Sequence, residues 1–267
     1  MTNPAANTAE GTPIYGMPVL DVAAAKHIVI CNYDLKPGYA GVDNPLYSRE
    51  EGVSLILGNA AETLQEMGIK VLLVNPEDQQ QLTGMIDLIA AATGTSAQAQ
   101  QLKDFAAAQE AALAETLADA EKPTVYLAGN SSMLSTAGDA MYQSDMIRIA
   151  GGVNVAGEIT DAYWVEISYE QLLAWDPAYI LLASDATYTV EDVLTDVNLS
   201  GLKAVANGQV YQLPSKAEAW DSPVPSGILG ALWLANVLHG DVLTDADCAD
   251  RIDEYYETFY DFTYSEN

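Results

Sequence analysis

The stretch from Ser96 to Ala120, SAQAQQLKDFAAAQEAALAETLADA, decides the fold. Nearly every position after Ser96 carries Ala, Gln, Leu or Glu, which are strong helix formers, and Ser96 is a good N-cap. At 1.5 Å per residue, the predicted helix is roughly 36 Å long, about the span of a domain. Its apolar residues form only a narrow stripe: Leu102, Phe105, Leu113 and Leu117. The stretch therefore predicts either an amphipathic surface helix or a rigid connector between two lobes.

Short apolar runs alternate with helical runs on both sides of this helix, a pattern typical of α/β proteins with parallel sheets. Ahead of it, the predicted strands and helices are strands 27–31 (HIVIC) and 70–75 (KVLLVN) and helices 52–68 and 78–94. After it, strands are predicted over 123–129, 178–184 and 208–215, and helices over 141–152, 168–177, 190–196, 199–205, 226–240 and 246–264. The pattern predicts two α/β lobes with parallel central sheets.

The same pattern sets the expected domain boundaries. The expected segments are a disordered linker (1–13), an amino-terminal lobe (14–95), the connecting helix (96–121), a carboxyl-terminal lobe (122–245) and a terminal helix (246–267). The small, polar residues of the first segment are typical of a linker behind a removed export signal or lipid anchor.

The composition excludes several classes of protein. Lys and Arg number 10 and Asp and Glu 38, so the net charge is −28. Such an acidic surface repels phosphate backbones and anionic lipid, and we expect no nucleic-acid partner and no docking on anionic membranes. Hydrophobic residues make up 49% of the 267 residues, which excludes an intrinsically disordered chain.

Groups that carry catalysis are few. Cys31 and Cys248 stand far apart without a CxxC motif or a His at ligand spacing, so two ordinary thiols are favoured over a long-range disulfide. His27 and His239 are isolated, which favours structural roles. The motifs of serine hydrolases, P-loop NTPases and HExxH metalloproteases are absent. We therefore expect no catalytic residue, no metal site, no cofactor and no enzymatic activity.

Aromatic and polar residues gather in the segments that follow the predicted strands. Ligands of α/β proteins bind at the carboxyl ends of strands, so these loops are the expected site. Their composition suits a bulky ligand that has apolar and hydrogen-bonding parts. The candidate ligand-binding residues are Tyr33, Asn130, Ser131, Ser132, Tyr163, Trp164, Tyr188, Lys216, Trp220 and Asp221.

The carboxyl-terminal half resembles the substrate-binding proteins of ABC importers for ferric siderophores, haem, cobalamin and related oxyanions. The matching segments stand in family order: 134–156 (LSTAGDAMYQSDMIRIAGGVNVA), 165–182 (VEISYEQLLAWDPAYILL), 202–215 (LKAVANGQVYQLPS) and 218–240 (EAWDSPVPSGILGALWLANVLHG). Each segment alone is a weak signal, whereas four in order at the family's spacing are a strong one.

This resemblance implies a fold, a location and partners. It implies two α/β lobes bridged by one long helix, with the ligand in the cleft between them, in a monomeric protein outside the cytoplasm or lipid-anchored at the outer face of the membrane. It also implies that one acidic residue on each lobe meets arginines of the permease. Glu170 holds the motif position on the carboxyl-terminal lobe, and Glu51 or Glu62 are candidates on the other. The implied ligand is a ferric siderophore or a related metal chelate.

Alternatives remain open at this point. Cobalamin or haem ranks second as ligand, and molybdate or tungstate third. A two-lobed enzyme similar to a metal chelatase, or an acidic adhesion module without a small ligand, are further interpretations. In one respect the chain departs from the family, which has a hairpin and a strand, helix and strand ahead of the segment matched by HIVIC. Either the sequence is truncated or the amino-terminal lobe is reduced.

Overall fold

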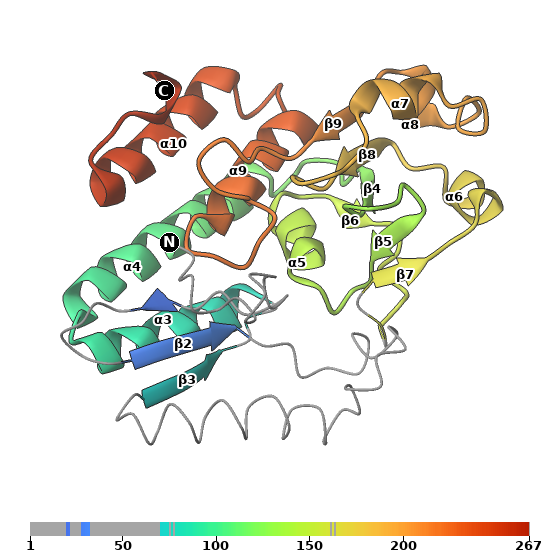
Figure 1. The fold of residues 1–267 in the computed structure, drawn as a ribbon. Coiled ribbons are helices and arrows are strands. Elements are labelled where there is room, and N and C mark those ends of the chain that lie inside the picture. The colour runs from blue at the N-terminus through green and yellow to red at the C-terminus, as the bar shows by residue number, and fades with distance from the viewer. Residues whose placement is uncertain are drawn as a thin grey trace, which may run out of the picture. The chain divides into compact units, whose positions relative to one another are not determined.

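The computed structural model has an α/β fold (Figure 1). It describes residues 78–160 and 164–266, Pro76 and Ala162, and the backbone of 20–21, 28–32 and 70–74. The expected linker and the helix predicted over 52–68 lie outside the described residues. The chain divides into two compact units, residues 1–76 with 80–100 and residues 77–79 with 101–267. Within the described residues, no helix combines the length and apolar character that crossing a bilayer requires.

The first unit contains a three-stranded sheet in the order β1-β2-β3. Strand β1 (Leu20–Asp21) pairs antiparallel with β2 (Ile28–Asn32), which pairs in parallel with β3 (Lys70–Val74). The two longer strands confirm the prediction from their apolar runs, whereas β1 has only two residues and was not predicted. Helix α3 (Gln79–Thr93) ends as predicted at Gly94, whose φ of 75° is the left-handed conformation that glycine favours.

The long helix is α4 (Ser96–Thr116). The backbone N–H of Ala99 donates to the carbonyl oxygen of Thr95 at 3.0 Å, so the helix is capped one residue earlier than predicted. It ends one turn before Ala120, and its 21 residues span about 32 Å. The boundary between the two compact units falls inside this helix, after residue 100.

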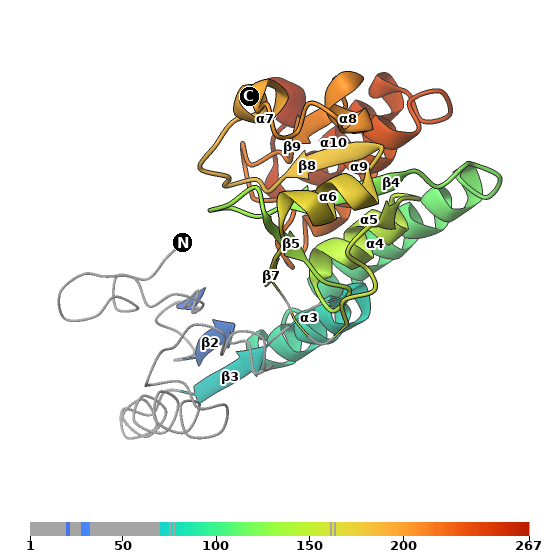
Figure 2. The ribbon, with the colours of Figure 1, turned by 90° about the vertical axis from the view of Figure 1, so that its right-hand side faces the viewer.

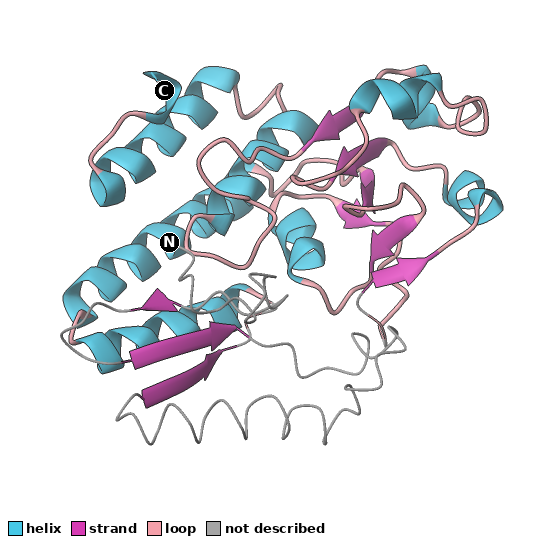
Figure 3. Ribbon diagram, viewed as in Figure 1, coloured by secondary structure: helices cyan, strands magenta, loops and turns pink. Residues whose placement is uncertain are grey.

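The second unit is built on a mixed sheet (Figure 3). Its strands are β4 (Thr124–Ala128), β5 (Ser135–Ala137), β6 (Val153–Asn154), β7 (Trp164–Glu166), β8 (Tyr179–Leu182) and β9 (Val210–Gln212). The order is β7-β5-β4-β8-β9, and β6 pairs with β4. Strands β4, β8 and β9 run parallel as predicted, and β6, which was not predicted, is also parallel to β4, but β5 and β7 are antiparallel to their neighbours. The expectation of a sheet that is parallel throughout is therefore corrected.

Strands β4 and β8 are apolar at nearly every position, so both faces of this sheet need to be covered. Tyr126 and Ile180 belong to a buried cluster with Leu172 of α6 (Tyr169–Trp175). Val125 faces the other way, and its side chain lies near Ile147 and Leu238 around Gly152. The sheet is therefore a layer between two sets of helices, which is the arrangement that buries continuous apolar strands.

The remaining helices confirm the predicted segments. They are α5 (Tyr142–Ile149), α7 (Val190–Thr195), α8 (Lys203–Ala206), α9 (Gly227–Leu238) and α10 (Asp245–Tyr260), followed by the 3₁₀ turn η3 (Tyr264–Glu266). Helices α5 and α9 pack together, and α10 packs on α9 (Figure 1). Figure 1 shows α6 and α5 on opposite sides of the β4–β8 pair, and in Figure 2 α6 lies in front of the strands.

Candidate functional site

The loops that follow β4 and β8 are joined by hydrogen bonds. The backbone N–H of Thr187 donates to the carbonyl oxygen of Asn130 at 2.8 Å, and the Tyr188 hydroxyl donates to that of Gly129 at 2.7 Å. Burial raises the pKa of Tyr188, so its hydroxyl remains a neutral donor. The structure thus brings together two of the five predicted loops and fixes their backbones.

Trp164 joins the same group of loops from β7. A Cβ atom placed on Gly129 would lie 3.0 Å from Cζ3 of Trp164, so the indole packs closely on this glycine. Trp164 is half-buried, which leaves part of the ring accessible beside the β4 loop. The neighbouring candidate residue Tyr163 lies outside the described residues.

Asp221 joins the loops after β8 and β9. Its carboxylate accepts from the backbone N–H of Ser184 at 2.8 Å and from the Ser184 hydroxyl at 2.6 Å. Its carbonyl oxygen accepts from the side-chain amide of Gln143 at 2.8 Å, and Gln212 donates to the Ser184 carbonyl at 3.2 Å. Asp221 is 6% exposed. Both carboxylate oxygens are therefore occupied within the protein, and this residue positions the loops.

Trp220 is a core residue in the structure. It is 1% exposed, and its indole N–H donates to the Tyr256 hydroxyl at 3.0 Å. We therefore assign it to packing rather than to the ligand contact expected from the sequence. The sequence of a strand-end loop does not indicate whether an aromatic ring turns towards a ligand or into the core, so the burial of Trp220 could not be predicted.

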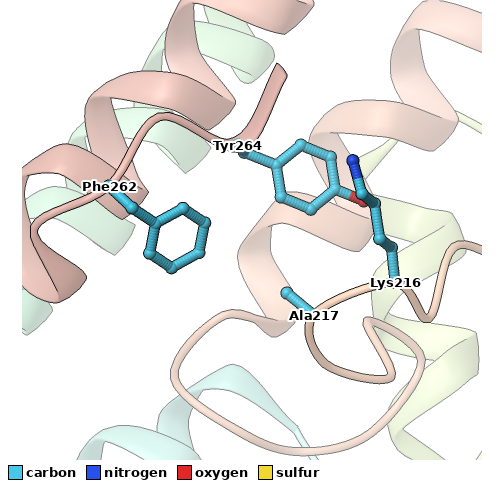
Figure 4. Close-up of a pocket in the computed structure, with 4 residues that line it drawn as sticks. All are labelled: Lys216, Ala217, Phe262 and Tyr264. Atoms are coloured by element: carbon cyan, nitrogen blue, oxygen red, sulfur yellow. The ribbon is translucent and has the colours of Figure 1, made fainter. Parts of the chain in front are cut away.

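Lys216 lies at an aromatic hollow, which we define by its lining residues Lys216, Ala217, Phe262 and Tyr264 (Figure 4). The hollow has a volume of about 580 Å³. The Lys216 Nζ atom is 5.2 Å from the centroid of the Tyr264 ring. Phe262 and Tyr264 come from the end of the chain, and no feature of the sequence placed them beside Lys216.

Three polar residues of the β4 loop stand at its open end. Asn130 and Ser131 are exposed, and within the described residues neither side chain has a hydrogen-bond partner. The Ser132 hydroxyl accepts from the backbone N–H of Leu134 at 3.1 Å, which closes the turn. Asn130 and Ser131 therefore offer hydrogen-bond donors to a ligand, whereas Ser132 shapes the loop.

The expected docking residue Glu170 lies in the first turn of α6 and is exposed. Hydrogen bonds from its own backbone N–H and from the Ser168 hydroxyl lower the pKa of its carboxyl group. The Ser168 hydroxyl also accepts from the backbone N–H of Gln171 as the N-cap of the helix. Tyr33, Glu51 and Glu62 lie outside the described residues.

The isolated His and Cys residues of the second unit are buried. His239 is 5% exposed at the end of α9, where it lies against Gly151. Cys248 has a free thiol, and burial raises its pKa to about 11. Among the described residues, no group of three or more His, Cys, Asp or Glu side chains is arranged to hold a metal ion.

Comparison with known families decides the assignment of most of the chain. Residues 54–217 match the family described as "Periplasmic binding protein". The chain belongs to the periplasmic binding protein family. The match includes α3, α4 and the sheet of the second unit, and this confirms the resemblance seen in the sequence.

Two curated relatives of this binding protein are named for their ligands. The molybdate-binding protein MolA of Haemophilus influenzae is 31% identical over 183 residues, which are 67% of this chain and 51% of MolA. The vitamin B12-binding protein of Salmonella typhi is 30% identical over 132 residues, 48% of this chain and 49% of that protein. The chain thus spans about half the length of these relatives.

Solved structures agree on the fold. A periplasmic solute-binding protein from Veillonella parvula superposes with a TM-score of 0.68 at 26% identity, covering 78% of this chain and 64% of that one. CeuE of Helicobacter pylori, solved with nickel and histidine, superposes with a TM-score of 0.70 at 21% identity. The superposition covers 90% of this chain and 70% of CeuE.

A different family matches the start of the chain. Residues 1–70 match the NAD(P) transhydrogenase beta subunit. The protein of that name from Rhodospirillum rubrum is 39% identical over 67 residues, 25% of this chain and 14% of that subunit. Tyr33 and Glu51 precede the binding-protein match, and Glu62 lies inside both matches. Sequence analysis missed this similarity, although the departure from the family pattern ahead of HIVIC was its sign.

Proposed function

We propose that this protein is the extracytoplasmic substrate-binding component of an ABC importer, which captures a metal-containing small molecule and delivers it to the permease. The observation that carries the proposal is the family match over residues 54–217. The joined loops after β4 and β8 support it, because they gather exposed donors beside a half-buried indole at the carboxyl ends of parallel strands. Binding, without catalysis, is the mechanism, and a monomer suffices for it.

The first ligand candidate from the sequence is a ferric siderophore or a related metal chelate. The half-buried rings of Trp164 and Tyr188 support this candidate. Trp220 does not, because it is buried in the core, and the Tyr188 hydroxyl is already used by Gly129. The aromatic surface left for a bulky chelate is therefore smaller than the sequence suggested.

We rank a molybdate-type oxyanion, which sequence analysis placed third, first among the ligands. The relative MolA is named as molybdate-binding, and a small oxyanion needs a few converging N–H and O–H donors rather than a large aromatic surface. Asn130 and Ser131 offer such donors. Cobalamin remains a third candidate, because another relative is named for vitamin B12.

Calorimetric titration of the full chain with molybdate, a ferric siderophore, cyanocobalamin and haem tests both levels of the proposal. We expect saturable one-to-one binding of molybdate, and an approximately tenfold weaker affinity after Asn130→Ala with Ser131→Ala, about the value of one to two net hydrogen bonds. Ser200→Ala, an exposed serine on another loop, is the control. Binding of a chelate instead of molybdate overturns only the ligand ranking, whereas no binding of any of the four contradicts the function.

A further inference from the structure

We propose that the aromatic hollow binds a small planar aromatic anion, with the ring against Phe262 and Tyr264 and the negative group on the Lys216 ammonium. This goes beyond the proposed function and does not depend on it, because all four lining residues belong to the carboxyl-terminal unit. The volume of about 580 Å³ lies in the range of small-molecule sites.

The aromatic wall of the hollow is held rigidly. The Tyr264 ring stacks on Tyr256 at 5.0 Å between centroids, and Trp220 packs against Tyr264 at 5.2 Å. The Tyr256 hydroxyl in turn accepts from the Trp220 indole. Because these rings are already ordered, a ligand that stacks on them loses little conformational entropy on binding.

The end of the chain is tied down beside these rings. Ser265 donates from its backbone N–H to one carboxylate oxygen of Asp253 at 2.9 Å and from its hydroxyl to the other at 2.6 Å. Phe262 packs on Tyr256 at 4.9 Å. The two lining rings therefore keep their places, and Figure 4 shows both rings above Ala217, with Lys216 beside the Tyr264 ring.

Charge selects the ligand. Lys216 is exposed and forms no ion pair within the described residues, whereas Arg148 pairs with Asp145 and Lys203 with Asp176. The nearby carboxylate of Glu218 is turned to α10, where its Oε1 lies 3.3 Å from the Tyr260 hydroxyl. Burial raises the pKa of Tyr264, so the ring wall carries no charge at neutral pH. The hollow thus presents a cation beside neutral aromatic faces, in a protein whose net charge is −28.

The test is calorimetry and ligand-observed NMR with the full chain and 1-naphthoate as the probe. We expect a dissociation constant of about 1 mM or below, from the usual free energy per heavy atom of a small ligand. Naphthalene-1-carboxamide, which lacks the charge, and cyclohexanecarboxylate, which lacks the aromatic ring, are each expected to bind at least about fivefold more weakly, the factor for one exposed ion pair or one ring contact.

Variants separate binding at the aromatic hollow from a general attraction between the anion and lysine side chains. Lys216→Gln is expected to weaken naphthoate binding about fivefold. The control Lys122→Gln removes the same charge from an exposed lysine ahead of β4, at the amino ends of the parallel strands, whereas Lys216 follows the carboxyl end of β9. It is expected to have no effect. Tyr264→Leu is expected to lose binding, and Tyr264→Phe to keep it. The proposal is overturned if 1-naphthoate does not bind at a concentration about tenfold above the expected dissociation constant. It is also overturned if naphthalene-1-carboxamide binds as tightly as naphthoate, or if the two lysine variants weaken naphthoate binding equally.

Discussion

Asp221 and Ser184 are the residues on which the arrangement of the strand-end loops depends most directly. The loops after β8 and β9 and the first turn of α5 meet around them, because the Asp221 carboxylate holds Ser184 and its carbonyl oxygen holds Gln143. Sequence analysis correctly located Asp221 in a loop after β9 but assigned it to the ligand. A carboxylate in a loop has the same sequence pattern whether it faces a ligand or a neighbouring loop, so only the fold separates the two roles.

Ser184→Ala tests this pairing. The substitution leaves the buried Oδ1 of Asp221 without its donor, so we expect a loss of about 1–3 kcal/mol in the free energy of unfolding. Urea denaturation followed by circular dichroism measures it. The exposed Ser200, whose hydroxyl donates to the Val197 carbonyl, is the control, and Ser200→Ala should stay within about 0.5 kcal/mol of the parent. Equal effects of the two substitutions would contradict the role of Asp221.

Gly129 has a different function, because it lets Trp164 approach the backbone. In Gly129→Ala the new Cβ would lie 3.0 Å from Trp164 Cζ3 and 3.2 Å from Ser135 Cβ. We expect the indole to shift, with a change in tryptophan fluorescence and a loss of about 1–3 kcal/mol in stability. At Gly201 an added Cβ meets only Leu173 at 3.7 Å, so Gly201→Ala should leave both quantities unchanged. Unaltered fluorescence in Gly129→Ala would show that the contact is not tight.

At the scale of elements, the success of sequence analysis follows the strength of the local pattern. Strands β4 and β8 are continuous apolar runs, and the ends of α3 and α6 coincide with Gly94 and with the residue before Pro177. The strands that were missed are only two or three residues long: β1, β5, β6 and β7. Three residues are too few for a periodicity of two to be recognised, and these strands exist because neighbours in the sheet pair with them.

The end of α6 offers a prediction at this scale. Asp176 adopts the left-handed conformation, accepts from the backbone N–H of Lys203 at 2.9 Å and pairs with its ammonium at 2.7 Å, which ties α6 to the start of α8. These interactions lower the pKa of Asp176. A carboxyl whose pKa is lower in the folded state stabilises the fold above its unfolded pKa of about 3.9, and this contribution is lost as the pH falls through the folded value.

Asp176→Asn should therefore lower the melting temperature at pH 7, and the difference from the parent should shrink as the pH falls towards 2 and the Asp176 carboxyl takes up a proton. Asn tolerates the left-handed conformation, so the backbone is not the cause. Asp250→Asn, on the exposed side of α10, is the control and should change the melting temperature at neither pH. A difference between Asp176→Asn and the parent that persists at pH 2 would point to packing instead of charge. Thermal melts between pH 2 and pH 7 provide the measurement.

At the scale of the whole molecule, the net charge of −28 takes on a more specific role than the exclusion of nucleic acid. Four ordered segments carried enough information to predict the family, because three of them combine a helix, its end and the following strand, and the fourth a loop and helix α9. Residues 1–53 lie ahead of the family match, and residues 1–70 are similar to a different protein. The binding proposal therefore rests on the carboxyl-terminal unit, and a receptor with an acidic surface would be kept off anionic lipid while single carboxylates recognise a permease.

Glu170 is the carboxylate for which this role can be tested. It is exposed at the start of α6, and its lowered pKa keeps it ionised well below neutral pH, so it can meet an arginine of the permease. We expect Glu170→Lys to reduce the stimulation of ATP hydrolysis by the cognate permease in proteoliposomes at least about tenfold, because a favourable charge pair becomes a repulsive one. The ligand affinity of the variant, measured by calorimetry, should be unchanged.

The matched control for this experiment is Glu191, an exposed glutamate in the first turn of α7. Glu191→Lys changes the net charge by the same amount at the same position of another helix, where Thr189 and Asp192 form the capping box. It should therefore leave the stimulation unchanged. Equal losses in both variants would attribute the effect to net charge, whereas an unaffected Glu170→Lys protein would show that α6 does not face the permease. Only a loss confined to Glu170 supports a docking contact there.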